Sequence, residues 1–304
     1  MYKIVRNGKE EVIKQNLYVH CGSNAKESYE LEYLTFPMFE EFSCVRHLFS
    51  TRTGGVSEGI FSTMNLSFTR GDDERAVTEN FMRIANVLGV SHEQIVCTDQ
   101  THTTNVRVVT GEDCGKGICR KRDYTDVDGL ITNEKGVVLA TFYADCVPLY
   151  FVDPVREVVG LSHSGWKGTV NGMGRETVLR MQQEFGCRPE DIYAAIGPSI
   201  CKECYEVSDD VAQAFERAFY ENEYLRKNNA YAQIVSYRDD AQKKAGKCQL
   251  DLHAANRWIL LSAGILREHI SVTDVCTAHN PEYLFSHRKT DGKRGNLGAF
   301  LCLV

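Results

Sequence analysis

The sequence predicts a mixed α/β fold, and two observations support this prediction. Runs rich in β-branched and aromatic residues, which are typical of strands, alternate with runs whose apolar residues recur at helical spacing. With 304 residues, of which 43% are hydrophobic and 25% charged, the chain also has the length and composition to bury a large core. Alternation of this kind is typical of layered α/β proteins.

The individual elements follow from these patterns. Strand-like runs occur at 47–51, 105–109, 137–143, 148–152, 158–162, 192–196 and 271–276. Helical periodicity occurs at 74–88, 172–185, 208–224 and 251–261. Residues 1–45 are polar and weakly patterned, so we expect an N-terminal extension there. We expect a single domain over 46–304, because no internal repeat or Pro/Gly/Ser linker divides that part.

Charge and hydropathy restrict the partners. The net charge is −6, so we expect no general attraction to nucleic acid or to anionic lipid. The N-terminus lacks the apolar segment of a signal peptide, and no run approaches the roughly 18 apolar residues of a spanning helix. We therefore expect a cytoplasmic protein without a membrane partner. The twelve cysteines are scattered through apolar contexts, so most should be reduced core residues.

Two of the expected strands run directly into side chains that can bind a metal. The strand at 137–143 is followed by Asp145 and Cys146, and the strand at 158–162 by His163. His102 follows another short apolar segment. Active-site groups in layered α/β proteins concentrate beyond the carboxyl ends of strands. The long intervals between these residues match no zinc-finger spacing, however, so spacing alone favours a buried apolar cysteine and hydrogen-bonded histidines.

A resemblance to a known family changes this interpretation. Seven motifs occur in order: Phe49-Ser-Thr-Arg-Thr-Gly-Gly55, Gln100-Thr-His102, Asp128-Gly-Leu130, Ala144-Asp-Cys-Val-Pro148, His163-Ser-Gly-Trp-Lys-Gly168, Ile196-Gly-Pro-Ser-Ile200 and Phe285-Ser-His-Arg288. Together they resemble the YfiH/YlmD family, also called the laccase-domain or polyphenol oxidase family. The match runs from about His47 to the C-terminus, which implies one catalytic domain over residues 46–304.

The resemblance implies a layered sandwich of stacked mixed β-sheets flanked by helices. It also implies about one zinc ion per chain, bound by His102, Cys146 and His163, with copper as the other possible metal. The implied activities are phosphorolysis of adenosine, inosine or methylthioadenosine and hydrolytic deamination of adenosine. The implied partners are therefore a purine nucleoside and phosphate. A homodimer is compatible with the sequence, which does not fix the oligomeric state.

Three protein ligands would leave one tetrahedral position of a zinc ion open, as in catalytic rather than structural sites. A zinc ion there can lower the pKa of a bound water to roughly 7. We expect His102, Cys146 and His163 to act in catalysis together with Asp145. Asp145 is either a base or a residue that orients the metal ligands, and the sequence does not choose between these roles.

Phosphorolysis also needs a phosphate site. Arg52 stands beside Gly54 and Gly55, which offers a cation next to accessible backbone N–H groups. Lys167 and Arg288 are the other candidate cations. Lys167 stands where the family commonly has arginine, and residues 293–296 stand where many members read Thr-Gly-Arg.

Three alternatives remain open, and the first two come from the resemblance. The first is a copper-dependent polyphenol oxidase, although the nine histidines include no His-x-His pair. The second is a cysteine hydrolase or deamidase with Cys146 as thiolate and His163 as base. The third is a non-enzymatic binding module in which a fourth protein ligand closes the open position of the metal. His287 and Cys276 are the candidates for that ligand.

A purine could also stack on a tryptophan, but Trp166 after a glycine is more typical of packing.

Cys201 and Cys204 form a single Cys-x-x-Cys pair. No second such pair accompanies it, and the surrounding sequence is unlike that of thioredoxin-type redox motifs. The sequence therefore favours structural thiols over a redox or metal site.

Overall fold

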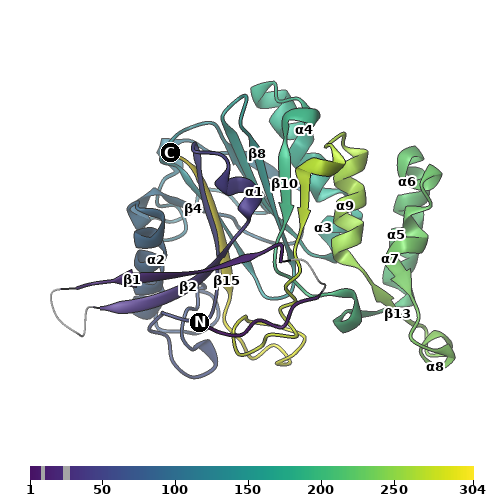
Figure 1. Cartoon of the computed structure of the whole chain (residues 1–304), viewed down its shortest axis with the longest axis horizontal. Helices are drawn as coiled ribbons and strands as arrows, with labels where there is room; N and C mark the ends of the chain where they lie inside the picture. The colour runs from purple at the N-terminus through teal and green to yellow at the C-terminus, as the bar shows by residue number, and fades with distance from the viewer. Residues whose placement is uncertain (8–10, 23–27) are drawn as a thin grey trace.

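Three β-sheets organise the chain (Figure 1). The computed structural model describes residues 1–7, 11–22 and 28–304. The first sheet has the order β1 (Lys14–His20), β2 (Tyr29–Thr35), β3 (Val45–Ser50), β15 (Leu297–Leu303), β7 (Val138–Tyr143), β4 (Ile95–Cys97). The second has the order β14 (Ile270–Val272), β10 (Tyr193–Ile196), β8 (Val147–Asp153), β9 (Val158–Ser164), β6 (Gly129–Thr132), β5 (Val106–Val108). A small third sheet has the order β11 (Glu206–Ser208), β13 (Lys247–Leu250), β12 (Val235–Ser236).

Helices cover the outer faces of the two large sheets. Within the described ranges the helices are α1 (Pro37–Glu40), α2 (Glu74–Leu88), α3 (Trp166–Val170), α4 (Met173–Phe185), α5 (Asp209–Glu221), α6 (Glu223–Lys227), α7 (Ala230–Ile234), α8 (Asp240–Lys244) and α9 (Leu252–Ser262). Figure 1 shows α2 beside the first sheet, with α4 and α9 on the opposite side of the molecule beside the second. The expected mixed α/β sandwich is confirmed, because each large sheet combines parallel and antiparallel pairs.

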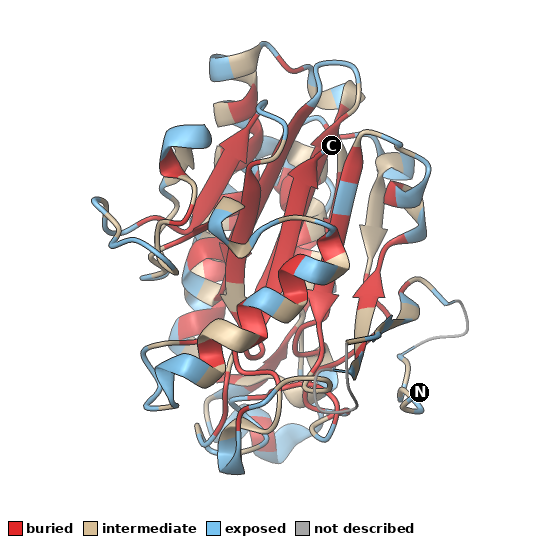
Figure 2. Cartoon of the chain, turned by 90° about the vertical axis from the view of Figure 1, so that its left-hand side faces the viewer, coloured by how far each residue is buried: buried red, intermediate tan, exposed pale blue. Residues whose placement is uncertain are grey.

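The alternation of side chains along the strands explains the layers. In β7, Leu139 packs into the core between the two large sheets, whereas Val138 and Ala140 pack against α2. In β8, Tyr150 points into the core between the sheets, and Leu149 points toward the helices on the other face. Figure 2 shows the result, with central strands buried and the outer surface of α2 exposed. In the amino-acid sequence, strands that are buried on both faces appear as nearly continuous apolar runs.

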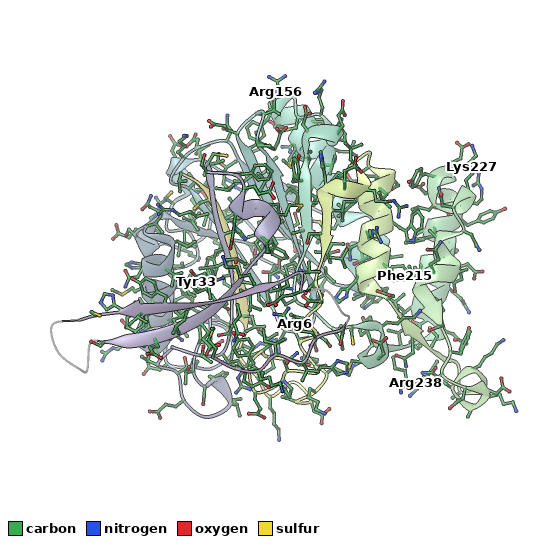
Figure 3. All side chains as sticks on the ribbon, viewed as in Figure 1. Arg6, Tyr33, Arg156, Phe215, Lys227 and Arg238 are labelled. Atoms are coloured by element: carbon green, nitrogen blue, oxygen red, sulfur yellow. The ribbon has the colours of Figure 1, made fainter. Side chains whose placement is uncertain are left out.

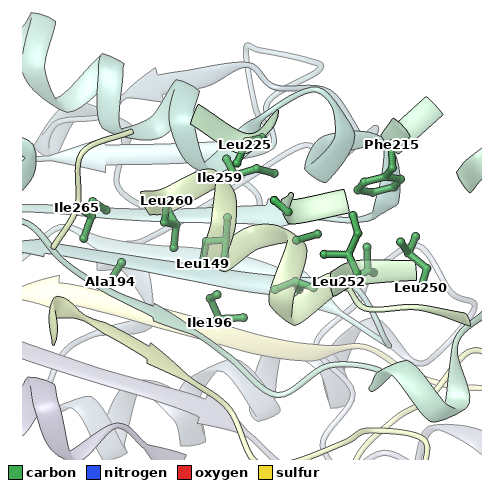
Figure 4. Packing of buried hydrophobic residues seen from close by; sticks show 14 of the residues in the cluster. Leu149, Ala194, Ile196, Phe215, Leu225, Leu250, Leu252, Ile259, Leu260 and Ile265 are labelled. Atoms are coloured by element: carbon green, nitrogen blue, oxygen red, sulfur yellow. The ribbon is translucent and has the colours of Figure 1, made fainter. Parts of the chain in front are cut away.

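The core outside the second sheet joins it to the helices that follow. Figure 4 shows Leu149 and Ile196 of the sheet together with Leu252 and Leu260 of α9. Phe215 of α5 continues the same cluster toward the third sheet. Figure 3 shows Lys227 at the outer edge of the α5–α7 unit and Phe215 on its inner side. The third sheet and α5–α8 therefore form an addition that packs on α9.

Most expected elements lie within a few residues of the observed ones. The expected helix at 74–88 matches α2, which begins after Asp73, whose side chain accepts hydrogen bonds from two backbone N–H groups. The expected helix at 208–224 is instead two helices, because Asn222 is extended and caps the second one. The expected strand at 271–276 is regular only as far as Val272, and beyond it only isolated bridges at Val275 and Cys276 continue the pairing.

Residues 14–35 form two strands, although the sequence shows only a weak pattern there. β1 and β2 pair along their whole length, and β2 joins the first sheet through β3. Side chains in β1 are mostly exposed or half-buried, so an alternating apolar face is absent from its sequence. The expected division into an extension and a domain over 46–304 stays a prediction. No helix of the described ranges is both long enough and apolar enough to cross a bilayer.

Candidate metal and active site

The fold brings His102, Cys146 and His163 together. One ligand atom of each lies within 4.8 Å of the others, and the Cys146 sulfur lies 3.9 Å from His102 Nε2. His163 stands in β9, and Cys146 lies directly before its hairpin partner β8. His102 comes from the loop after β4. Two imidazoles and a thiol at this separation form a donor group suited to a single metal ion.

Asp128, which sequence reasoning quoted in a motif but gave no role, organises this group. Its carboxylate accepts a 2.7 Å hydrogen bond from His163 Nδ1. It also accepts hydrogen bonds from the backbone N–H groups of Thr101, His102 and Thr103. A carboxylate that holds one imidazole nitrogen leaves the other nitrogen free for a metal. Asp128 thus fixes both the ring of His163 and the loop that carries His102.

Burial and charge set the ionisation of the pair formed by Cys146 and His163. Burial opposes ionisation of the thiol, but the charge on His163 and hydrogen bonds with both histidines outweigh it and lower the pKa of Cys146 to about 6. Burial also opposes protonation of His163, but the thiolate and the Asp128 hydrogen bond raise the pKa of His163 to about 9. Without a metal, Cys146 is therefore a thiolate near neutral pH, the form that binds metals.

Asp145 has both carboxylate oxygens occupied within the protein. Oδ1 accepts a 2.6 Å hydrogen bond from the Thr277 hydroxyl, and Oδ2 accepts one of 2.7 Å from the backbone N–H of Arg288. Its backbone has φ 89°, and that of His102 has φ 68°. Positive φ angles at residues other than glycine are strained and cluster at functional sites. These contacts favour the orienting role for Asp145 over the role of a base.

Gly165 leaves the space in which the three donors meet. A Cβ atom at this position would lie 2.8 Å from Cδ2 of His102 and 3.1 Å from the sulfur of Cys146. The 2.8 Å contact is shorter than real Cβ atoms make, so a side chain here would displace the ring of His102. The requirement for glycine could not be recognised from the sequence, because His102 is distant along the chain.

Two cavities meet at the donor group, and both are lined by His102 and Cys146. The smaller one, of about 290 Å³, is completed by Asp145, Trp166, Lys167, Ile200, Tyr205 and Leu252. The larger one, of about 930 Å³, is lined by five basic side chains and only two carboxylates, those of Glu74 and Asp99. The basic residues are Arg70, Arg120, Lys121, Arg122 and Arg294. One cavity is thus largely apolar and aromatic, and the other is cationic.

Arg294 is the one buried side chain among the five basic residues of the large cavity. It is only 9% exposed, and its Nε has no hydrogen-bond partner. Nη1 donates to the side chain of Asn296 and to the backbone oxygen of Gly295. Burial and the nearby Arg70 lower the pKa of Arg294 to about 10, so it stays charged at neutral pH. A largely buried, charged guanidinium that lines a cavity is suited to bind an anion there.

Arg52 and its two glycines lie apart from these cavities. Its Nε donates to the carbonyl oxygen of Ser62 and its Nη1 to that of Pro281. A Cβ on Gly55 would lie 2.1 Å from the Thr63 carbonyl oxygen, and the Gly55 N–H donates to the Thr63 hydroxyl. The contacts described for this segment are internal, and Arg52 lines neither cavity.

The other candidate cations are also placed by the structure. Lys167 lines the small cavity with its Nζ 5.8 Å from the ring centre of Trp166. Arg288 lines neither cavity, and its Nη1 donates to the backbone oxygen of Glu206 at 2.9 Å. Its guanidinium lies over Tyr205 at 5.1 Å. Lys167 is therefore near the donor group, whereas Arg288 holds the wall that carries Tyr205.

No fourth His, Cys, Asp or Glu of the described residues joins the group of His102, Cys146 and His163. His287 is not part of it, and Cys276 belongs to a separate cluster. The two residues considered as closing ligands therefore do not occupy that position.

Comparisons with known proteins place the chain among relatives of similar sequence and fold. A family model described as multi-copper polyphenol oxidoreductase laccase matches residues 46–304. The chain is similar to the purine nucleoside phosphorylase YlmD of Bacillus subtilis (strain 168), with 40% identity over 257 residues, 83% of this chain and 86% of that protein. It is also similar to a protein named adenosine deaminase RL5 from an unknown prokaryotic organism, with 34% identity covering 79% and 87% of the two chains.

Among solved structures, the crystal structure of the hypothetical protein YfiH from Bacillus licheniformis resembles this fold with a TM-score of 0.80. The two chains are 33% identical, and the match covers 90% of this chain and 96% of that one.

Proposed function

This chain belongs to the laccase-domain family that includes YlmD and YfiH, and we propose from this that it is a zinc-dependent purine nucleoside enzyme. Its proposed reactions are phosphorolysis of adenosine, inosine or methylthioadenosine and hydrolytic deamination of adenosine. The names of the relatives support an enzyme of this type. The observation that carries the proposal is the position of His102, Cys146 and His163 where an aromatic cavity meets a cationic one.

The donor set fits the metal that the family implies. Two imidazoles and one thiolate suit zinc. The carboxylate of Asp128 orients His163, as carboxylates that hydrogen-bond a ligating histidine do in zinc enzymes. A zinc ion held in this way would supply Lewis acidity to the reaction. The same donor set also suits copper, so the identity of the metal needs direct measurement.

The smaller cavity is proposed to hold the purine base. Its wall includes the rings of Trp166 and Tyr205 and the side chains of Ile200 and Leu252. Aromatic and aliphatic side chains bind a flat heterocycle by stacking and by excluding water. A nucleoside bound there would place its reactive part beside His102 and Cys146.

The larger cavity is proposed to hold phosphate. Its basic side chains outnumber its carboxylates, and the largely buried guanidinium of Arg294 lines it. The sequence-based candidate Arg52 directs two donors to backbone oxygens instead. We therefore assign the phosphate contact to Arg294 rather than to Arg52.

Removal of the metal separates this proposal from a cysteine hydrolase. We expect a chelator to abolish turnover of adenosine, inosine and methylthioadenosine, and added Zn²⁺ to restore it. A cysteine hydrolase would keep its activity, because Cys146 and His163 already form a thiolate and an imidazolium without metal. Products would be identified by chromatography with and without phosphate. Restoration by Cu²⁺ alone, with oxygen consumption on phenols, would instead support the oxidase alternative.

Asp128 should act as a positioning residue for the metal. We expect Asp128→Asn to lower metal affinity and turnover by about 10- to 100-fold, as is typical when an outer carboxylate of a zinc site is lost. Asp126→Asn is the matched control, because Asp126 contacts the same loop through Thr101 but is exposed. Metal affinity would be measured by competition with a chromophoric chelator. Unchanged metal affinity in Asp128→Asn would assign Asp128 to folding of the loop alone.

A further inference from the structure

We propose that this chain carries a second, structural zinc site with four protein ligands: Cys201, Cys204, Cys276 and His279. One ligand atom of each residue lies within 4.8 Å of the others. The group is separate from the one at the active site, with which it shares no residue. Three cysteines and one histidine form one of the donor sets of closed, tetrahedral structural zinc sites.

The sequence contains the two halves of this site, far apart along the chain. Cys201-Lys-Glu-Cys204 is a Cys-x-x-Cys pair, and Cys276-Thr-Ala-His279 has the same spacing with histidine as its second donor. Sequence reasoning interpreted the first half as structural thiols because no second Cys-x-x-Cys accompanies it. The structure supplies the partner, since the second half ends in histidine rather than cysteine.

Neighbouring parallel strands bring the halves together. β10 and β14 pair in parallel, and the chain beyond each of them remains paired through Ser199 and Cys276. The Thr277 N–H donates to the Ser199 oxygen at 3.1 Å. Both halves therefore leave the same edge of the second sheet on the same side. A short turn over 202–204 then returns Cys204 toward Cys201.

Local distances are close to those of a zinc site. The sulfur of Cys201 lies 3.9 Å from Nδ1 of His279, whereas a sulfur and a nitrogen on one tetrahedral zinc are separated by about 3.5 Å. The backbone N–H of Cys201 donates to the sulfur of Cys276 at 3.3 Å. Hydrogen bonds of this kind orient metal ligands and partly neutralise thiolate charge. In the metal-free chain the Nδ1–H of His279 donates to the side-chain oxygen of Asn7 at 3.1 Å, so zinc would replace this proton.

The position of the cluster explains what a metal would stabilise. Ile200, next to Cys201, lines the small cavity, and its N–H donates to the backbone oxygen of Asp145. Thr277, next to Cys276, donates to the Asp145 carboxylate. A zinc ion bound by Cys201 and Cys276 would fix the two segments that hold Asp145 and one wall of the active site. It would do so without contacting substrate.

Metal content in paired variants tests this site independently of the proposed function. We expect about two zinc equivalents in the whole chain, one in Cys146→Ser, one in His279→Ala, and none in the double variant. His279→Ala is chosen because His279 is exposed, so its loss leaves the core intact. Cys44→Ser, which removes a half-buried cysteine outside both clusters, should keep both equivalents.

Cobalt gives a second, spectroscopic measurement. Reconstituting Cys146→Ser with Co²⁺ should produce the strong near-ultraviolet sulfur-to-cobalt bands and the visible bands of a tetrahedral, thiolate-rich site. These bands should disappear when Cys204→Ser is added. Zinc removal should also lower the Tm of Cys146→Ser, because a structural metal contributes to folding. If Cys146→Ser holds no zinc while it remains folded, or if mass spectrometry shows a disulfide among residues 201, 204 and 276, the second site is wrong.

Discussion

Replacing Cys146 with serine should abolish turnover of every nucleoside substrate while leaving the fold intact. The serine hydroxyl is a poor zinc ligand at neutral pH, because it stays protonated where the Cys146 thiol has a pKa of about 6. Loss of an outer carboxylate costs about 10- to 100-fold, so loss of a direct ligand should cost more than about 100-fold. Cys146 is half-buried, and the two side chains have similar shape, so the core should tolerate the change.

The measurement combines turnover, metal content and thermal unfolding. The first-site zinc should be lost, whereas Tm should stay within a few degrees of the parent, after correction for metal-dependent stabilisation. Cys44→Ser serves as the control for removing a half-buried thiol. Retained turnover together with a lost zinc equivalent would show that the metal at His102, Cys146 and His163 is incidental to the chemistry.

Replacing Arg294 with glutamine should separate the two proposed activities. Inorganic phosphate is a reactant only in phosphorolysis, so a residue that binds it should affect phosphorolysis selectively. Loss of a charge-assisted contact is worth about 1.5–3 kcal/mol, which lowers phosphate-dependent kcat/KM by about ten- to a hundred-fold. The loss should appear as a raised KM for phosphate, and adenosine deamination should change much less.

Arg52→Gln distinguishes this assignment from the one suggested by sequence. Its guanidinium bonds two backbone oxygens and lies over Phe285 at 4.6 Å, so its loss should lower both activities equally, together with Tm. A selective loss of phosphorolysis in Arg52→Gln, with none in Arg294→Gln, would return the phosphate site to the glycine turn at residues 54 and 55.

Much of the fold could be predicted because the core is built from local patterns. The strands at 137–143 and 158–162 are apolar on both faces, and α2 carries a capping aspartate and one apolar side. β1 was missed because its side chains are not deeply buried, so its sequence has no alternating pattern of apolar residues. β15 was also missed. All seven residues of Leu297–Leu303 are buried, but no strand was predicted from this apolar run.

The candidate site was only partly accessible from sequence. His102, Cys146 and His163 were named through family motifs, since their spacing alone favoured unrelated roles. The structure brings them together, but their binding of zinc stays a prediction. Arg294 was passed over as part of a divergent tail, because its burial and its free Nε are properties of the folded chain.

By itself, the sequence determined the class of fold, the family, and the residue types that a metal site requires. These depend on short-range periodicity and on ordered motifs, which are properties of neighbouring residues. The tertiary structure alone decided which of those residues meet. Parallel pairing of β10 with β14 joins Cys201 to Cys276, and the carboxylate of Asp128 joins the His102 loop to His163. Such contacts depend on strand order and register. No local pattern of the sequence specifies which strands become neighbours.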